Sequence, residues 1–174
     1  RVGEGEGTLR VSPVQSRFLS QLKRKGDLSG FRPGTPVIDL TGYSGIAAYV
    51  MSARTFASPF LYSGFHWSNG WARAVVRNIP CEKAAGAWIV WTGSKLEPGI
   101  ATSVLGEAGL DFPDGYRLAF SVSGARGEYA TDPAGIAFFE PKDYRRNLES
   151  CVETGKAANL PQGTWQEKLP SADS

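Results

Sequence analysis

Cysteine, histidine and long apolar runs are all scarce in this chain of 174 residues. Its two cysteines and one histidine are too few for a conventional zinc site, which takes four such ligands. No apolar run approaches the 18 or so residues that span a bilayer, and no basic-then-apolar signal peptide is present. We therefore predict no membrane-spanning segment within this sequence, no metal site and no cofactor.

A strong excess of charge of one sign is also missing. The chain has 19 Lys and Arg against 17 Asp and Glu, whereas nucleic-acid-binding domains usually carry a marked basic excess. We therefore expect no nucleic-acid partner. The one basic cluster, KRKG at 23–26, lies at the end of a predicted helix, where cations complement the helix dipole. Contact with anionic lipid headgroups is the alternative.

The composition is otherwise that of a globular protein, with 41% apolar and 11% aromatic residues. A chain of this length buries about 70% of the surface that its unfolded form exposes, so it can build a core without metal or disulfide. We predict a linker and amphipathic helix over 1–27, an α/β domain over 28–150 and a C-terminal tail over 151–174. Because the chain starts at Arg1 with a glycine-rich stretch, we expect it to be a piece of a longer protein.

Hydrophobic patterning predicts strands that alternate with helices. The apolar runs 36–40 and 87–93 are typical of buried strands, and turn signals join two further predicted strands. Alternation of this kind predicts an α/β fold with a layered, mainly parallel, Rossmann-like sheet, helices on both faces and an antiparallel edge. The later strands are predicted at 116–124 and 128–141, and the helices at 12–26, 45–54, 68–79, 97–110 and 142–156.

Two of the predicted helices carry clear local signals. Ser12 is a good N-cap, Pro13 suits the first helical position and Gly26 is expected to end the first helix. The helix that follows Ser68 has apolar residues at helical spacing, which predicts a stripe that faces the core. The members of this stripe are Trp71, Val75 and Ile79.

A binding site, if there is one, is expected in the turn after the first predicted strand. The stretch TPVIDLTGYSG places Asp39, Thr41, Tyr43 and Ser44 at the carboxyl end of a strand, where open α/β sheets bind ligands. The turn is not a nucleophile elbow, since Ile46 stands where that motif needs glycine, and it lacks a phosphate-loop pattern. A helix cap made by these polar residues is the simpler interpretation.

The irregular aromatic segment 56–70 contains the single histidine, His66, beside Trp67. A histidine-based reaction must use His66, but no spacing in the sequence supports a triad. A packed structural histidine is the simpler interpretation. The aromatic rings can either stack on a sugar or fill the space between sheet and helix. We name no catalytic residue, and the candidate ligand contacts are Asp39, Thr41, Tyr43, Ser44, His66 and Trp67.

The two cysteines, Cys81 and Cys151, allow two interpretations. As a disulfide they would close a loop of about 70 residues and stabilise the fold by ~4 kcal/mol through chain entropy. Such a bond persists in an oxidising compartment such as the periplasm. Two buried free thiols are the alternative.

The stretch PVIDLTGYSG, followed by ARAVVRNIPCEKAAGAWIVW, resembles a group of bacterial membrane proteins. In that group a multi-spanning region similar to polyprenyl-phosphate-dependent glycosyltransferases precedes a soluble C-terminal domain. The likeness covers about 34–92 and departs from the group at 56–70. It implies a periplasmic domain attached to an upstream membrane domain of the same protein, and it assigns no catalytic residue.

These observations lead to two functional hypotheses. The first is a non-catalytic periplasmic accessory domain of a membrane glycosyltransferase-like protein, which binds a glycan, a polyprenyl-linked lipid carrier or a protein partner. The second is a small hydrolase or transferase that uses Asp39, Ser44 and His66, and it requires these side chains to converge within hydrogen-bonding distance.

Overall fold

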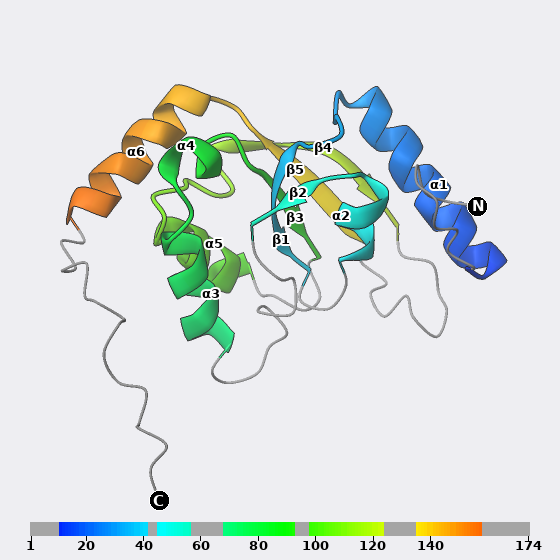
Figure 1. Cartoon of the computed structure of the whole chain (residues 1–174), viewed down its shortest axis with the longest axis horizontal. Helices are drawn as coiled ribbons and strands as arrows, with labels where there is room; N and C mark the ends of the chain where they lie inside the picture. Colours follow the sequence, from blue (N-terminus) through cyan, green and yellow to red (C-terminus); the bar gives the residue numbers. More distant parts are fainter. Residues whose placement is uncertain (1–10, 42–44, 57–67, 93–97, 124–134, 158–174) are drawn as a thin grey trace, which may run out of the picture.

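The computed structural model describes residues 11–41, 45–56, 68–92, 98–123 and 135–157. These residues form an α/β fold in which helices pack against a five-stranded mixed sheet of strand order β2-β1-β3-β5-β4 (Figure 1). The strands are β1 (Pro36–Leu40), β2 (Arg54–Thr55), β3 (Trp88–Trp91), β4 (Tyr116–Val122) and β5 (Ile136–Pro141). The helices are α1 (Pro13–Leu28), α2 (Ile46–Val50), α3 (Ser68–Arg77), α4 (Cys81–Ala84), α5 (Pro98–Gly106) and α6 (Tyr144–Ala157).

The sheet is not mainly parallel, so that part of the predicted fold class is wrong. Strand β1 pairs in parallel with β2 and β3, whereas β5 pairs antiparallel with both β3 and β4. The antiparallel pairing covers more residues than the parallel pairing. The sequence between β4 and β5 carries glycine and Asp-Pro turn signals and no helix pattern, which favours direct antiparallel return over a helical crossover.

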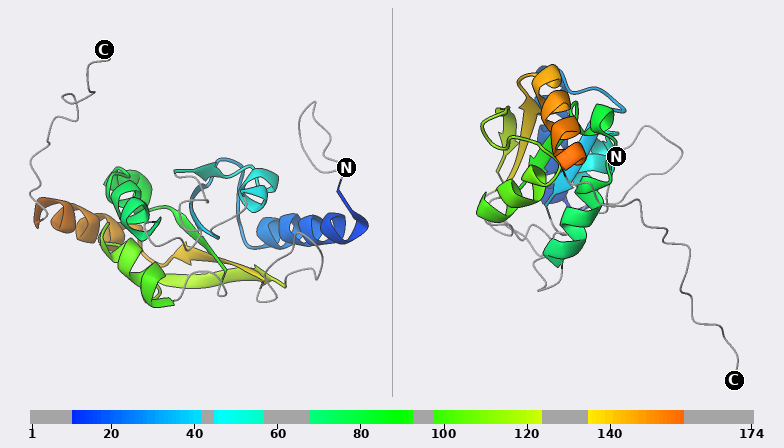
Figure 2. Two further views of the ribbon diagram at one scale, coloured as in Figure 1. Left: turned by 90° about the horizontal axis from the view of Figure 1, so that it is seen from below. Right: turned by 90° about the vertical axis from the view of Figure 1, so that its left-hand side faces the viewer.

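Two apolar clusters form on opposite sides of the strands, because successive strand residues point to opposite faces. Ile38 and Ile89 belong to the cluster that contains residues of α3, α4, α5 and α6. Val37 and Val90 belong to the cluster that contains residues of α1 and α2. The two groups of helices accordingly lie to either side of the strands (Figures 1 and 2).

Helix α1 starts as predicted but does not end at Gly26. The Ser12 hydroxyl accepts a hydrogen bond from the Gln15 N–H at 3.2 Å, and the Gln15 side chain accepts one from the Ser12 N–H at 3.0 Å. Gly26 lies inside the helix and is buried. A Cβ at Gly26 would lie 2.0 Å from the Met51 methyl, so a larger residue here requires the flexible Met51 side chain to turn away. Gly26 therefore marks a close approach of α1 to the end of α2 and not a helix stop.

The basic cluster at the end of α1 contacts the sheet. Lys25 donates a hydrogen bond from Nζ to the backbone oxygen of Ser121 at 2.7 Å. The Ser29 hydroxyl donates to the backbone oxygen of Ala119 at 3.3 Å. Both acceptors are in β4, which is an edge strand of the sheet. Leu19 of α1 is also buried in the cluster beside the sheet, so α1 is part of the packed unit.

The helix predicted over 45–54 is shorter, and a strand follows it. Helix α2 stops at Val50, and Ser52 adopts a positive φ of 51°, which breaks the helical path. Arg54 and Thr55 then pair with β1. A strand of two residues has no periodic pattern, so the sequence could not reveal it.

The predicted core stripe is wrong at Trp71 and right at Ile79, which follows α3 and is buried. Trp71 is 60% exposed, and Val75 is only partly buried. The residues that enter the core are Ala72, Val76 and Ile79. The face of α3 that carries Trp71 is therefore directed outward.

The structure joins Cys81 and Cys151 in a disulfide, with Cα atoms 5.6 Å apart. The bond connects the first residue of α4 to the middle of α6. Cys151 is buried in the apolar cluster, and α6 continues to Ala157. The packed unit therefore extends beyond residue 150.

Candidate functional site

The carboxyl ends of the neighbouring strands β1 and β3 bring three buried polar side chains together. Leu40 and Trp91 are partners in the parallel register of these strands, so the residues that follow them, Thr41 and Thr92, leave the sheet side by side. Asp39 lies two residues before Thr41. All three side chains are 0% exposed.

The carboxyl ends of β1 and β3 also form a topological switch point. After β1 the chain enters α2, whose Ala47 packs in the cluster with α1. After β3 it enters α5, whose Leu105 packs in the cluster on the opposite side. Open α/β sheets bind ligands at such a switch point, outside the carboxyl ends of the strands. We use the word crevice for this position between the ends of β1 and β3, where Asp39, Thr41 and Thr92 lie.

The hydrogen bonds of the three side chains leave two atoms without partners. Asp39 Oδ1 accepts hydrogen bonds from the Thr41 N–H at 2.9 Å and from the Thr41 hydroxyl at 2.7 Å. Asp39 Oδ2 and Thr92 Oγ1 are buried and have no hydrogen-bond partner within the described part of the chain. An unpaired buried polar atom costs about 1–3 kcal/mol, so such atoms are rare unless a water or ligand satisfies them.

Burial raises the pKa of Asp39, while the hydrogen bonds from the Thr41 hydroxyl and backbone act in the opposite direction. Desolvation is the larger effect because a charged carboxylate loses its hydration inside the protein. The folded state therefore holds a proton on Asp39 at pH values where the unfolded state has already released it.

The pKa of Asp39 leads to a stability prediction. Because the folded-state pKa lies above the unfolded value of about 3.9, Asp39 stabilises the fold fully below that pH, and this stability is lost as pH rises through the folded pKa. The slope for one proton is at most ~1.4 kcal/mol per pH unit. Asp39→Asn should abolish this contribution, as measured by urea unfolding at several pH values from 4 upward.

The exposed carboxylate Asp111 supplies the control for this measurement. The Asp111→Asn variant should keep the decline in stability that the wild-type chain shows. If Asp39→Asn and the wild type lose stability with pH in parallel, the proposed rise of the Asp39 pKa is contradicted.

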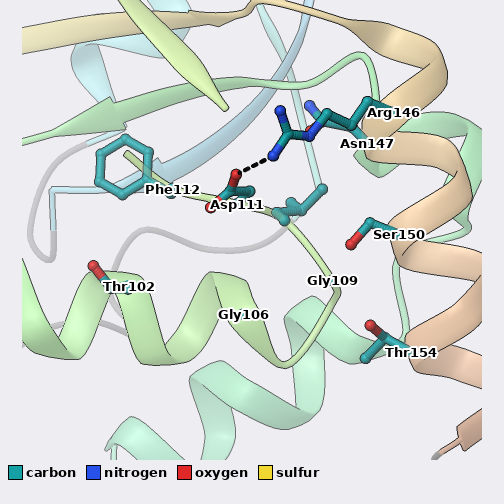
Figure 3. A pocket seen from close by; sticks show the side chains of 10 residues that line it. Thr102, Gly106, Gly109, Asp111, Phe112, Arg146, Asn147, Ser150 and Thr154 are labelled. Carbon is teal, nitrogen blue, oxygen red and sulfur yellow. Dashed lines mark hydrogen bonds and ion pairs between the residues drawn. The ribbon is translucent and has the colours of Figure 1, made fainter. Parts of the chain in front are cut away.

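A polar hollow of about 440 Å³ lies between α5 and α6 (Figure 3). Arg146 and Asp111 point toward one another across it and form an ion pair at 3.2 Å, which neutralises the only cation that lines it among the described residues. The ion pair is largely exposed, so it contributes little. The described lining residues are Thr102, Gly106, Gly109, Leu110, Asp111, Phe112, Arg146, Asn147, Ser150 and Thr154.

The hollow is the weaker candidate because its described lining residues contain no buried polar side-chain atom that lacks a hydrogen-bond partner. The third such atom in the described chain is the hydroxyl of Tyr116, and burial raises the pKa of this phenol. Tyr116 begins β4, which runs in the same direction as β3. Its hydroxyl therefore belongs to the opposite end of the strands from Thr92.

The structure brings together only part of the predicted site. Asp39 and Thr41 meet at the carboxyl end of β1, while Tyr43, Ser44, His66 and Trp67 lie outside the described residues. Thr92 falls inside the predicted strand 87–93, so the sequence pattern does not single it out. The rule that selected Asp39, a polar residue at the carboxyl end of a buried strand, also selects Thr92 once β3 is seen to end before it.

The described residues contain no group of three or more His, Cys, Asp or Glu side chains that could hold a metal ion. No protein family, curated protein or solved structure matches this chain. Within the described residues, no helix has both the length and the apolar character needed to cross a membrane.

Proposed function

We propose that this chain is a non-catalytic binding domain that receives hydroxyl groups of a glycan in the crevice between β1 and β3. The observation that carries the proposal is the pair of buried, unpaired atoms at the topological switch point, Asp39 Oδ2 and Thr92 Oγ1. Asp39 Oδ2 accepts hydrogen bonds when the carboxyl is ionised and donates one when it is protonated, and a threonine hydroxyl both donates and accepts them. Neighbouring sugar hydroxyls, which also donate and accept, match this pair.

The same chemistry favours a glycan over the phosphate of a lipid carrier. A phosphate group near neutral pH carries negative charge and offers mainly acceptor oxygens. An ionised Asp39 would repel that charge, and the three residues that define the crevice, Asp39, Thr41 and Thr92, include no cation to offset it. The crevice therefore suits a neutral polyol better than an anionic headgroup.

The proposed setting is the periplasmic side of a membrane glycosyltransferase-like protein, as an accessory domain joined to an upstream membrane domain. Two observations support it: the resemblance over 34–92 and the Cys81–Cys151 disulfide, which is a kind of bond that persists in oxidising compartments. In this proposal the parallel strands β2, β1 and β3 act as the ligand-binding half of a Rossmann-like, layered sheet.

Thermal unfolding in the presence of a panel of neutral oligosaccharides tests the function. A glycan at a hundred times its Kd should stabilise the domain by about 2.7 kcal/mol. Thr92→Val should weaken binding about tenfold, because it removes the hydroxyl but keeps the shape. The same change should leave folding stability equal or higher, since it also removes an unpaired buried atom.

Ser150→Ala in the polar hollow is the matched control, and it should bind the glycan like the wild type. If Ser150→Ala lost binding while Thr92→Val kept it, the hollow and not the crevice would be the site. Because the crevice side chains are 0% exposed, binding has to displace whatever covers them. A structure at saturating glycan that shows only a water between Asp39 and Thr92 would overturn the proposal.

A further inference from the structure

Helix α3 presents apolar side chains on two faces, and only one of them is buried against the sheet. Ala72 and Val76 are 0% exposed and lie in the core. On the other face Trp71 is 60% exposed and Val75 is only partly buried. An exposed tryptophan beside further apolar residues is typical of a binding surface.

The outward face of α3 forms one wall of a groove of about 390 Å³. This volume lies within the range of ~300–1,000 Å³ that is usual for small-molecule sites. Phe56, which follows the edge strand β2, and the start of α4 also contribute to the groove. The described residues that line it are Phe56, Trp71, Ala74, Val75, Asn78, Ile79, Pro80 and Lys83.

The groove is apolar except at Asn78 and Lys83. Lys83 is exposed and forms no ion pair within the described part of the chain. The arginines of α3 are engaged elsewhere: Arg73 donates to Ser103, and Arg77 pairs with Glu107. An apolar groove with one available cation, Lys83, complements a ligand that has an apolar chain and an anionic headgroup.

We infer that this groove binds a single-chain amphiphile with an anionic headgroup. The chain lies against Trp71 and Val75, and the headgroup pairs with Lys83. A sugar is a poorer match, because orienting its hydroxyls requires more polar groups than the two in the groove. A stable protein partner is also a poorer match, because it generally buries at least ~1,000 Å² of total surface and the groove is small. The inference uses no residue of the crevice between β1 and β3 and does not depend on its glycan.

Calorimetric titration with octyl phosphate below its micelle concentration tests the inference, with octanol as the uncharged comparison. Octyl phosphate should bind more tightly than octanol. Trp71→Ala should weaken both at least tenfold, because it removes the largest apolar wall. Lys83→Gln should weaken octyl phosphate about threefold to fivefold and leave octanol unchanged.

Two matched variants control for general effects. Tyr49→Ala removes an equally exposed aromatic from α2, and Arg24→Gln removes an exposed cation from α1; both helices pack on the other side of the sheet. Both variants should bind octyl phosphate like the wild type. Circular dichroism should show an unchanged fold for all four variants, since each substituted side chain is exposed.

Three results would overturn the inference. One is equal affinity for octanol and octyl phosphate, and another is binding that Trp71→Ala leaves intact. The third is binding to phosphatidylglycerol vesicles with no binding of monomeric octyl phosphate, since that result indicates contact with a membrane surface and not with a chain held in the groove.

Discussion

Replacing Cys81 and Cys151 together by alanine is expected to lower the free energy of unfolding by about 2–5 kcal/mol. The disulfide closes a loop of 70 residues, so its loss gives the unfolded chain many more conformations. The substitution also removes the covalent link between α4 and α6. A hydrogen bond from the Tyr144 hydroxyl to the Glu82 backbone oxygen, 3.4 Å long, also joins these helices but is long and therefore weak. Urea unfolding monitored by circular dichroism measures the change.

Reductant provides the control for this prediction. Dithiothreitol should shift the unfolding midpoint of the wild-type chain to that of the double variant, and it should have no effect on the double variant itself. A wild-type midpoint that is insensitive to reductant would show that the bond does not form in the purified protein.

Gly109→Ala is expected to destabilise the fold by about 3 kcal/mol or more. Gly109 has a φ of 71°, which costs a residue with a Cβ about 1–2 kcal/mol. A Cβ at this position would also lie 2.5 Å from the backbone oxygen of Ser150 in α6. This second contact is with backbone and cannot be relieved by turning a side chain, so α6 has to move away from the loop.

Gly106→Ala is the matched control, because it adds the same methyl group three residues earlier. Gly106 ends α5, and a Cβ there meets nothing within 4 Å. Alanine in a helix is more favourable than glycine by up to ~1 kcal/mol, so Gly106→Ala should match or exceed wild-type stability in urea. Equal stability of Gly106→Ala and Gly109→Ala would contradict the close packing of the loop against α6.

Local signals in the sequence were sufficient for several elements. The apolar run 36–40 coincides with β1, because Pro36 and the glycine-containing turn bound it on both sides. Ser12 and Gln15 form the capping box that starts α1. In both cases the determining residues are neighbours in the chain, so the pattern is visible without knowledge of the fold.

Features that depend on distant contacts were not predictable. Helix α3 has apolar residues on two faces, and adjacent positions differ by only 100° around a helix. Spacing alone therefore could not tell that Ala72 and not Trp71 faces the sheet. Thr92 belongs to the site only because β3 is the neighbour of β1, and strand order is not encoded in any local stretch. Asp39 was found because its signal, a carboxylate at the end of a strand, is local.

The side-chain contacts from α1 to β4 have a consequence for how the protein behaves at high concentration. An edge strand offers unpaired backbone groups on which a strand of another molecule can add, and this is a common route to aggregation. Strand β4 spans seven residues, whereas the other edge strand, β2, spans two. Strand β4 also carries the exposed Leu118. Lys25 and Ser29 occupy two of its backbone oxygens, so α1 protects the sheet against intermolecular strand addition.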